Sequence, residues 1–234
     1  MKQRVRFTKL GKIRFLSHRD LARIWERGLR RSGIRVAYSE GFSPRPRLSF
    51  GLALSTGHES LGEYLDIDLA EDLDPADLPG IVTPSLPGGM VAQIAIPIPV
   101  GIDSLQQAVT SSSWRIELAE VSPTRLADAV ERALAAEALP IQVERKGNEV
   151  TLDARPAILA LTHDDVVLEA ELATQPRSLR PAELLRALDP TWGEGRVLRT
   201  HQWTLVDGAR CEPIPFGDTG TRGATSTPHA GARA

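Results

Sequence analysis

The residues best suited to chemistry lie in two short motifs within the first fifty positions of the chain. The first motif, FLSHRD, places the hydroxyl of Ser17 and the imidazole of His18 at the start of an expected helix. Unpaired backbone N–H groups and the helix dipole attract phosphate or carboxylate at such a terminus. A competing interpretation is that Ser17 is only a helix cap, with Asp20 three residues later, and that His18 is a structural histidine. The motif therefore supports anion binding and does not by itself establish catalysis.

The second motif is the loop YSEGFSPRPR. Gly41 permits a turn, and the two prolines stiffen the segment. Tyr38 and Phe42 are able to stack on a base, and Arg45 and Arg47 offer bidentate contacts to phosphate. Phe42 is equally compatible with a position in the core. The Pro-Arg-Pro-Arg run is also compatible with an ordered loop that binds nothing.

The two motifs and the arginines of the helix between them form the candidate anion- or RNA-binding surface. Its residues are Ser17, His18, Arg19, Arg23, Arg27, Tyr38, Ser39, Gly41, Phe42, Arg45 and Arg47. No catalytic residue is assigned, and His18 is the candidate for a general acid or base. The sequence does not determine whether the loop lies near the start of the helix.

The sequence lacks the residues that metal, redox and nucleotide-cofactor chemistry would require. Iron–sulfur or radical chemistry needs several cysteine thiolates, and the chain has only Cys211. Zinc needs three or four ligands at suitable spacing, whereas the five histidines are scattered singly. His58 and Glu59 could pair, but Gly57 favours a plain turn there. Neither a dinucleotide-binding, a P-loop nor a nucleophile-elbow motif is present. We therefore expect no metal site and no cofactor.

Charge is distributed very unevenly along the chain. Its net charge is −2, yet the first fifty residues hold 14 Lys and Arg against 3 acids, or +11, and the remainder holds 14 against 27, or −13. Such an imbalance predicts a positive face that attracts anions and speeds their association. The alternative is that the basic residues simply pair with the acidic remainder.

Hydrophobic periodicity predicts the elements that must position these motifs. Alternation over 3–9 indicates a strand, and Leu21, Ile24, Trp25 and Leu29 form the apolar stripe of a helix ending at Gly33. The first half follows the order of a split βαβ unit, strand–helix–strand–strand–helix–strand. Its expected strands are 3–9, 13–16, 36–38, 48–54, 64–69 and 91–97, and its expected helices are 17–33 and a short one near 74–79.

The second half repeats this order more weakly and without obvious sequence identity. Its expected strands are 114–119, 141–145, 150–153, 158–163, 166–173 and 197–206, and its expected helices are 122–139 and 181–188. We therefore predict an α+β protein of two tandem ferredoxin-like (βαββαβ) halves with antiparallel sheets. The expected divisions are a basic half 1–100, a linker 101–113, a second half 114–207, and a tail 208–234 that is disordered from about 217.

The expected location is the cytoplasm, with no membrane partner. No run of about 18 apolar residues is present, as a transmembrane helix would require. The basic N-terminus is not followed by the apolar region of a signal peptide. A single cysteine cannot form an internal disulfide, which agrees with a reducing compartment.

The two motifs together resemble a known family. The segments FLSHRDLARIWERGLRRSG and AYSEGFSPRPRLSFGLALSTGHESLGEYLDIDL are similar to the radical SAM-linked protein family, a bacterial domain of unknown function. The similarity is strong over roughly the first hundred residues and elsewhere extends to the general layout. The positions that match the family pattern are Ser17, His18, Tyr38, Ser39, Gly41, Phe42, Pro44 and Arg45.

This resemblance implies an accessory role. Such domains are fused to, or encoded beside, B12-binding-type radical SAM proteins, often near ribonuclease E/G and ribosomal-protein genes. The family has no established catalytic residues to carry over. Because this chain has no radical SAM portion, the resemblance implies a separate radical SAM protein as its partner.

Three hypotheses for the function follow. The first is a non-catalytic RNA-binding or substrate-presenting module that works with a radical SAM enzyme in RNA or ribosome-related modification. The second is a metal-independent RNA-processing nuclease, with His18 as general acid or base and Arg45 or Arg47 stabilising the developing charge. The third is a protein–protein scaffold whose basic face binds an acidic partner.

Overall fold

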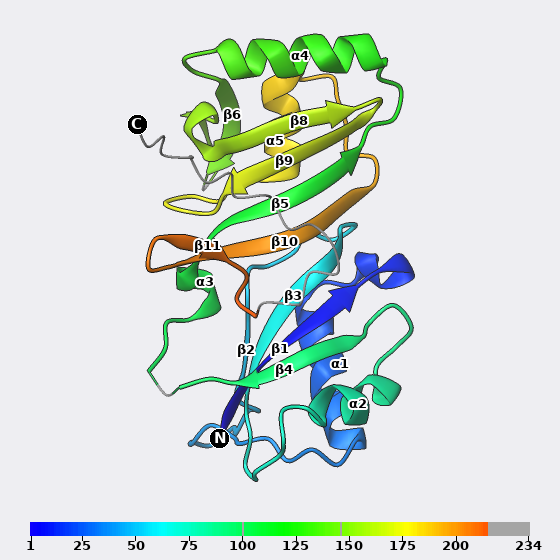
Figure 1. Cartoon of the computed structure of the whole chain (residues 1–234), viewed down its shortest axis with the longest axis vertical. Coiled ribbons are helices and arrows are strands. Elements are labelled where there is room, and N and C mark those ends of the chain that lie inside the picture. The colour runs from blue at the N-terminus through cyan, green and yellow to red at the C-terminus, as the bar shows by residue number, and fades with distance from the viewer. Residues whose placement is uncertain (100, 146, 215–234) are drawn as a thin grey trace, which may run out of the picture.

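The structure is a computed structural model that describes residues 1–99, 101–145 and 147–214. Within these residues the fold is mixed α+β, with five α-helices and a nine-stranded, mostly antiparallel sheet. Figure 1 shows this sheet running the length of the molecule, with α1 and α2 beside its lower part and α4 and α5 beside its upper part. The predicted α+β class is confirmed.

The first half contributes four strands and two helices. They are β1 (Lys2–Lys9), α1 (His18–Arg31), β2 (Leu48–Phe50), β3 (Glu59–Asp68), α2 (Leu78–Val82) and β4 (Ala92–Pro97). The strands lie in the order β4-β1-β3, β2 pairs with the other edge of β3, and every one of these pairings is antiparallel.

The second half contributes the remaining seven strands. Its elements are α3 (Leu105–Ala108), β5 (Val109–Glu117), α4 (Pro123–Ala135), β6 (Pro140–Arg145), β7 (Asn148–Asp153), β8 (Ile158–Asp164), β9 (Val167–Ala173), α5 (Pro181–Leu188), β10 (Val197–Val206) and β11 (Ala209–Cys211). The main strands lie in the order β10-β5-β9-β8, β11 pairs with β10, and β6 and β7 form a separate hairpin.

A parallel pairing between β3 and β10 joins the two halves. Glu59 lies opposite Leu198, and Ser60 lies opposite Arg199. The expectation of separate sheets is therefore wrong: the halves share one sheet. Because β2 ends at Phe50, the first residues of β3 have a free edge that β10 occupies. Local periodicity indicates which residues form strands, but it does not show which edges of distant strands meet.

Several expected boundaries also differ. Residues 13–15 belong to a 3-10 helix, Gly11–Phe15, which Leu16 caps, so the strand expected over 13–16 does not form, and 36–38 forms only isolated bridges. β5 begins at Val109, so the segment between the halves is shorter than the predicted linker 101–113. The expected disorder from about 217 lies outside the described residues. These short segments carry too few residues for periodicity to identify them.

The motif-bearing helix α1 packs on β1 through the expected apolar stripe. Leu21, Trp25 and Leu29 are buried, and the ring centroids of Phe7 and Trp25 are 4.9 Å apart at an interplanar angle of 69°. Burying such a side chain contributes about 1.5–3 kcal/mol, so this contact fixes the helix on the sheet. A second core lies in the other half, where α4 and α5 pack on the sheet.

None of the helices in the described part of the chain is long and apolar enough to cross a membrane.

Candidate functional site

Ser17 is the N-cap of α1. Its hydroxyl accepts a hydrogen bond from the backbone N–H of Asp20 (3.2 Å) and donates one to the Asp20 carboxylate (2.7 Å). The hydrogen bond from Ser17 holds the pKa of Asp20 below its ordinary value, so this carboxylate is charged at neutral pH. Negative charge at a helix N-terminus stabilises the helix. An anionic ligand at this terminus would therefore meet a carboxylate that is already in place.

His18 is exposed at the first position of α1. Its ring lies edge-on to Phe50 of β2, with ring centroids 5.2 Å apart. Its imidazole makes no hydrogen bond to any described residue, and the Ser17 hydroxyl bonds to Asp20 instead. No described side chain forms a hydrogen bond that would orient the His18 ring for acid–base chemistry.

The loop of the second motif projects from the body of the protein. The backbone N–H of Ser39 donates to the carbonyl of Arg45 (2.9 Å), and the N–H of Arg45 donates to the Ser39 hydroxyl (3.0 Å). Gly41 adopts φ +118°, a conformation that glycine allows at low cost. Phe42, near the tip, is fully exposed, which rules out a core position for its ring.

The arginines of the candidate surface are all exposed, but they differ in their partners. Arg23 lies 3.5 Å from the Asp20 carboxylate, and Arg47 lies 3.9 Å from that of Asp68. Arg27 donates only to the backbone carbonyl of Arg23. The guanidinium groups of Arg19 and Arg45 make no hydrogen bond or ion pair with any described residue, and so they remain available to a ligand.

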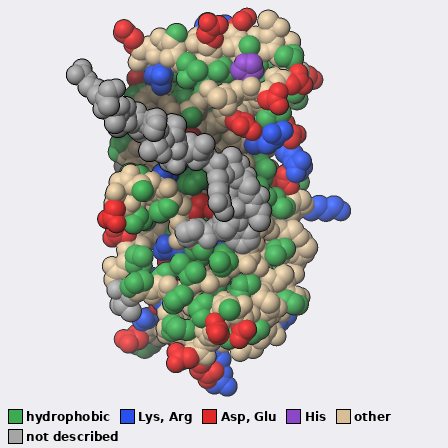
Figure 2. Space-filling model, viewed as in Figure 1, with side chains coloured by type: hydrophobic (Ala, Val, Ile, Leu, Met, Phe, Trp, Pro, Cys, Tyr) green, Lys and Arg blue, Asp and Glu red, His purple; other side chains and the backbone are tan. Residues whose placement is uncertain are grey.

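Three of the basic residues counted in the first fifty do not reach the surface. Arg4, Arg6 and Lys9 of β1 are buried. Arg4 forms a bidentate pair with Asp66 at 2.7 and 3.1 Å, and Arg6 lies 3.5 Å from Glu212. The charge of +11 therefore overstates the basic surface. On the face seen in Figure 2, acidic and basic side chains are mixed around the rim, and hydrophobic side chains gather over the lower half.

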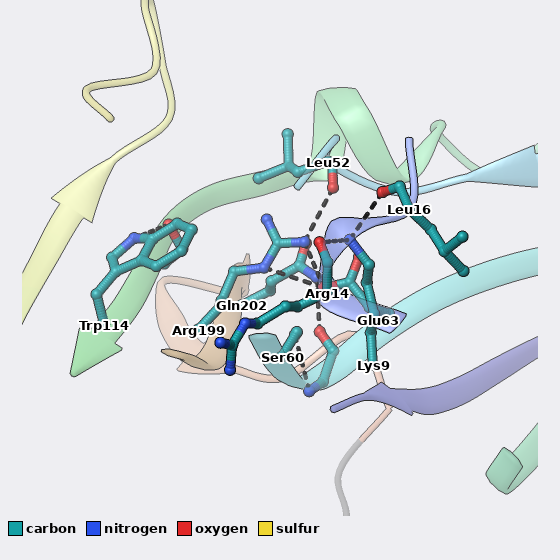
Figure 3. A network of polar contacts seen from close by, with 11 residues as sticks. Lys9, Arg14, Leu16, Leu52, Ser60, Glu63, Trp114, Arg199 and Gln202 are labelled. Carbon is teal, nitrogen blue, oxygen red and sulfur yellow. Dashed lines mark hydrogen bonds and ion pairs between the residues drawn. The ribbon is translucent and has the colours of Figure 1, made fainter. Parts of the chain in front are cut away.

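Lys9 anchors the segment that leads into α1 (Figure 3). Its ammonium group donates to the carbonyl oxygens of Arg14 and Leu16, each at 3.2 Å. Burial lowers the pKa of Lys9, Arg199 adds to this effect, and Glu63 opposes it. Because Leu16 immediately precedes the N-cap, this buried lysine sets where the helix begins on the sheet. Lys9 shares strand parity with Val5 and Phe7, a signal that could have indicated its burial.

Arg199 and Glu63 complete this network at the junction of the two halves. The guanidinium of Arg199 donates to the Glu63 carboxylate at 2.5 Å and to the carbonyl of Leu52 at 3.0 Å. It also lies 5.5 Å from the centroid of the Trp114 ring. Figure 3 shows these side chains converging where β3 meets β10. A buried charge needs a close partner, so this cluster holds the halves in register.

A pocket of about 360 Å³ opens between the C-terminal end of α1 and the base of the loop. It is lined by Glu26, Leu29, Arg30, Gly33, Ile34, Arg35, Val36, Tyr38, Pro46 and Ala70. Tyr38 therefore lies beside the last turns of α1, whereas His18 lies at the first. Twelve residues separate His18 from Arg30, which corresponds to about 18 Å along a helix. The predicted residues thus form two groups, one at each end of α1.

Sequence reasoning missed several residues of these two groups. Phe50 supports His18, and Arg30 and Ala70 line the pocket beside Tyr38. Arg30 lies three residues after Arg27, a spacing that places both on one side of a helix, and this signal could have added it to the candidate surface. Phe50 and Ala70 carried no comparable signal, because they reach the site only through tertiary folding.

No group of three or more His, Cys, Asp or Glu side chains in the described part of the chain is placed to hold a metal ion. A search of curated proteins finds no match to the sequence. The sequence profile of one family, described as "uncharacterized protein conserved in bacteria" (DUF2344), matches residues 2–181, a span that includes both motifs and the pocket but ends before Arg199 of the junction network. The chain belongs to this bacterial family.

Proposed function

We propose that this protein is a non-catalytic RNA-binding module that presents RNA to a separate enzyme. The proposed surface consists of the outer side of α1 and the loop 38–47. The observation that carries the proposal is the fully exposed ring of Phe42, held near the tip of a loop that hydrogen bonds close at its base. An aromatic ring displayed in this way has both faces free to stack on a base.

The unpaired charges of the proposed surface favour a nucleic acid as the ligand. Arg19, Arg30 and Arg45 are exposed, and none of their guanidinium groups is paired with a described residue. Phosphate binding to them therefore requires no ion pair to be broken. Proteins that bind single strands combine such cations with aromatic rings on which bases stack, and each stacked base contributes about 1–3 kcal/mol.

Two finer proposals concern the partner and the fold. The resemblance of the two motifs to radical SAM-linked proteins supports a separate radical SAM enzyme as the partner, acting on RNA or the ribosome. The strand orders support a tandem pair of ferredoxin-like units: β4-β1-β3-β2 in the first half is matched by β10-β5-β9-β8 in the second. In this interpretation the hairpin β6–β7 is an insertion in the second unit.

The test of RNA binding is a mobility-shift titration against total tRNA and ribosomal RNA fragments over a series of salt concentrations. We expect binding whose constant falls steeply as salt rises, because phosphate contacts release counterions. Replacing Phe42 with Ala should weaken binding about tenfold. Leu205→Ala is the matched control, because Leu205 is an exposed apolar residue of the second half. Absent or salt-insensitive binding would overturn the proposal.

Co-purification from a bacterial host tests the partner. We expect RNA and a radical SAM protein to accompany the wild-type chain, and the RNA to be lost with Phe42→Ala. Recovery of an acidic protein that survives nuclease treatment, without RNA, would favour the scaffold hypothesis instead. Cleavage of RNA by the purified protein, lost in His18→Ala, would show that the module is an enzyme.

A further inference from the structure

The pocket at the C-terminal end of α1 has the size and lining of a small-ligand site. Its volume of about 360 Å³ lies within the range of roughly 300–1,000 Å³ that is usual for such sites. Leu29, Ile34, Val36 and Ala70 give it an apolar surface, and Tyr38, half of whose side chain is exposed, supplies an aromatic wall. A planar, largely apolar group therefore fits its interior.

The rim of this pocket carries the charge that a nucleotide needs. Arg35 is paired with Glu71 at 2.7 Å and is thereby held in place. The guanidinium group of Arg30 makes no hydrogen bond or ion pair with a described residue, even though Glu26 lies one helical turn before it on the same pocket rim. Arg30 is therefore the pocket cation that is available to a phosphate.

The backbone around Tyr38 is already ordered. Tyr38 forms a bridge with Pro46, and the N–H of Arg47 donates to the carbonyl of Ala37 at 2.8 Å. Preorganisation of this kind reduces the entropy lost when a ligand binds. Tyr38 is also the first residue of the loop whose tip carries Phe42, so one loop supplies both a wall of the pocket and the exposed ring.

We propose that this pocket binds one unpaired nucleotide of single-stranded RNA, with the base against Tyr38 and the phosphate on Arg30. The inference rests on the proposed RNA-binding function and names its substrate class. The bases of an A-form duplex are stacked inside the helix and cannot enter a pocket, whereas unpaired bases can be splayed out and stacked on aromatic rings. The protein should therefore prefer single strands to duplexes.

The test fills the pocket and leaves the basic surface intact. Ala70 is exposed, so Ala70→Phe inserts a ring without disturbing the core, and Ala70→Ser is the matched control. The probes are a short fluorescent single-stranded RNA and the duplex of the same sequence, followed by anisotropy. We expect Ala70→Phe to weaken single-strand binding about tenfold, the effect of losing one stacked base, and Ala70→Ser to bind as the wild type does. The salt dependence should not change, because the phosphate contacts remain.

The outcomes separate this inference from the proposed function. If the wild type binds the single strand and the duplex equally well, and Ala70→Phe binds both as the wild type does, the proposal that the pocket binds a nucleotide is wrong. The proposal of RNA binding would remain. Absence of all RNA binding by the wild type would overturn both. If thermal melting shows that Ala70→Phe is unfolded, Tyr38→Ala provides the test. A tenfold loss of affinity for the single strand alone supports the proposed nucleotide site. An unchanged affinity for the single strand contradicts it.

Discussion

The strand β1 and the helix α1 are neighbours in the sequence and both are rich in basic residues, yet those of β1 are largely buried and those of α1 are exposed. Arg4 and Arg6 of β1 are buried and paired, whereas Arg19 and Arg30 of α1 are exposed and their guanidinium groups make no hydrogen bond or ion pair with a described residue. β1 lies between β3 and β4, so both of its edges are occupied. The charges of β1, a strand inside the sheet, are therefore enclosed, whereas those on the outer side of α1, a helix that covers the sheet, are exposed.

The faces of β1 reinforce this difference. One face is covered by α1 and α2, and beyond the other lies a small cluster in which Leu105 and Ile214 pack on Tyr64 of β3. The acids that pair with the buried cations, Asp66, Glu63 and Glu212, all come from beyond residue 50. The interpretation that basic residues pair with the acidic remainder thus holds for β1 and fails for the outer side of α1.

The largest expected effect comes from removing Glu63. In Glu63→Ala, Lys9 and Arg199 remain buried without a carboxylate, which should destabilise the protein by about 3–5 kcal/mol in urea denaturation. The control is Glu71→Ala, which removes the exposed pair with Arg35 and should cost less than about 1 kcal/mol. Similar losses in the two variants would contradict the distinction between buried and exposed charges.

The pair Arg4–Asp66 sharpens the same comparison. Asp66→Ala leaves Arg4 buried without its bidentate partner and should cost about 3 kcal/mol. The double variant Arg4→Met/Asp66→Leu should recover most of this loss, because apolar side chains of similar volume can replace a buried ion pair. Urea denaturation of the wild type and of the two variants measures how much of the loss is recovered. A double variant no more stable than Asp66→Ala would show that the pair stabilises the fold beyond charge compensation.

Arg30 is the counterpart on α1. Arg30→Ala should leave the free energy of unfolding within about 0.5 kcal/mol of the wild type, because its side chain is exposed. The same change should weaken RNA binding and reduce the slope of log K against log salt by about 1. Arg132→Ala, an exposed arginine of α4, serves as the control and should change neither quantity. A loss of stability in Arg30→Ala would show that this arginine, like those of β1, stabilises the fold.

The smallest expected effect is a pH dependence at Lys9. Burial lowers the pKa of Lys9 in the native state below its ordinary 10.5. Between these two values the unfolded chain binds more protons, so the free energy of unfolding should rise with pH. Lys9→Met should lack this rise in urea titrations at alkaline pH. Burial also raises the pKa of Tyr64, which should lower the free energy of unfolding as the pH rises above its ordinary 10.0. Tyr64 is present in both proteins, so its effect cancels when the wild type is compared with Lys9→Met. Parallel pH profiles for the two proteins would show that Lys9 is not perturbed.

Local sequence patterns predicted the helix that carries the first motif. The helix expected over 17–33 is α1, His18–Arg31, capped by Ser17 and followed by Gly33 at φ +78°. Its apolar stripe is buried on the sheet apart from Ile24, which is half-buried. These features depend on residues within one or two helical turns of each other, and so they are visible in the sequence.

The candidate site was predicted only in part. The projection of Phe42 depends on Gly41 and on hydrogen bonds within the loop, and the motif already indicated that loop. The placement of Tyr38 beside Arg30, far from His18, was not predictable, because it depends on how the loop packs against α1. The sequence left open whether the loop lies near the start of the helix, and in the fold the candidate residues form two groups at the two ends of α1.

The sequence by itself determined the α+β class, the span of α1 and the location of both motifs, because these depend on short-range periodicity and turn residues. Tertiary structure alone decided that β3 and β10 pair and that Arg199 is buried against Glu63. It also decided which arginines of the basic segment stay exposed. The physical reason is that a charge is buried only where a distant strand supplies its counter-charge, and such pairings leave no local pattern in the chain.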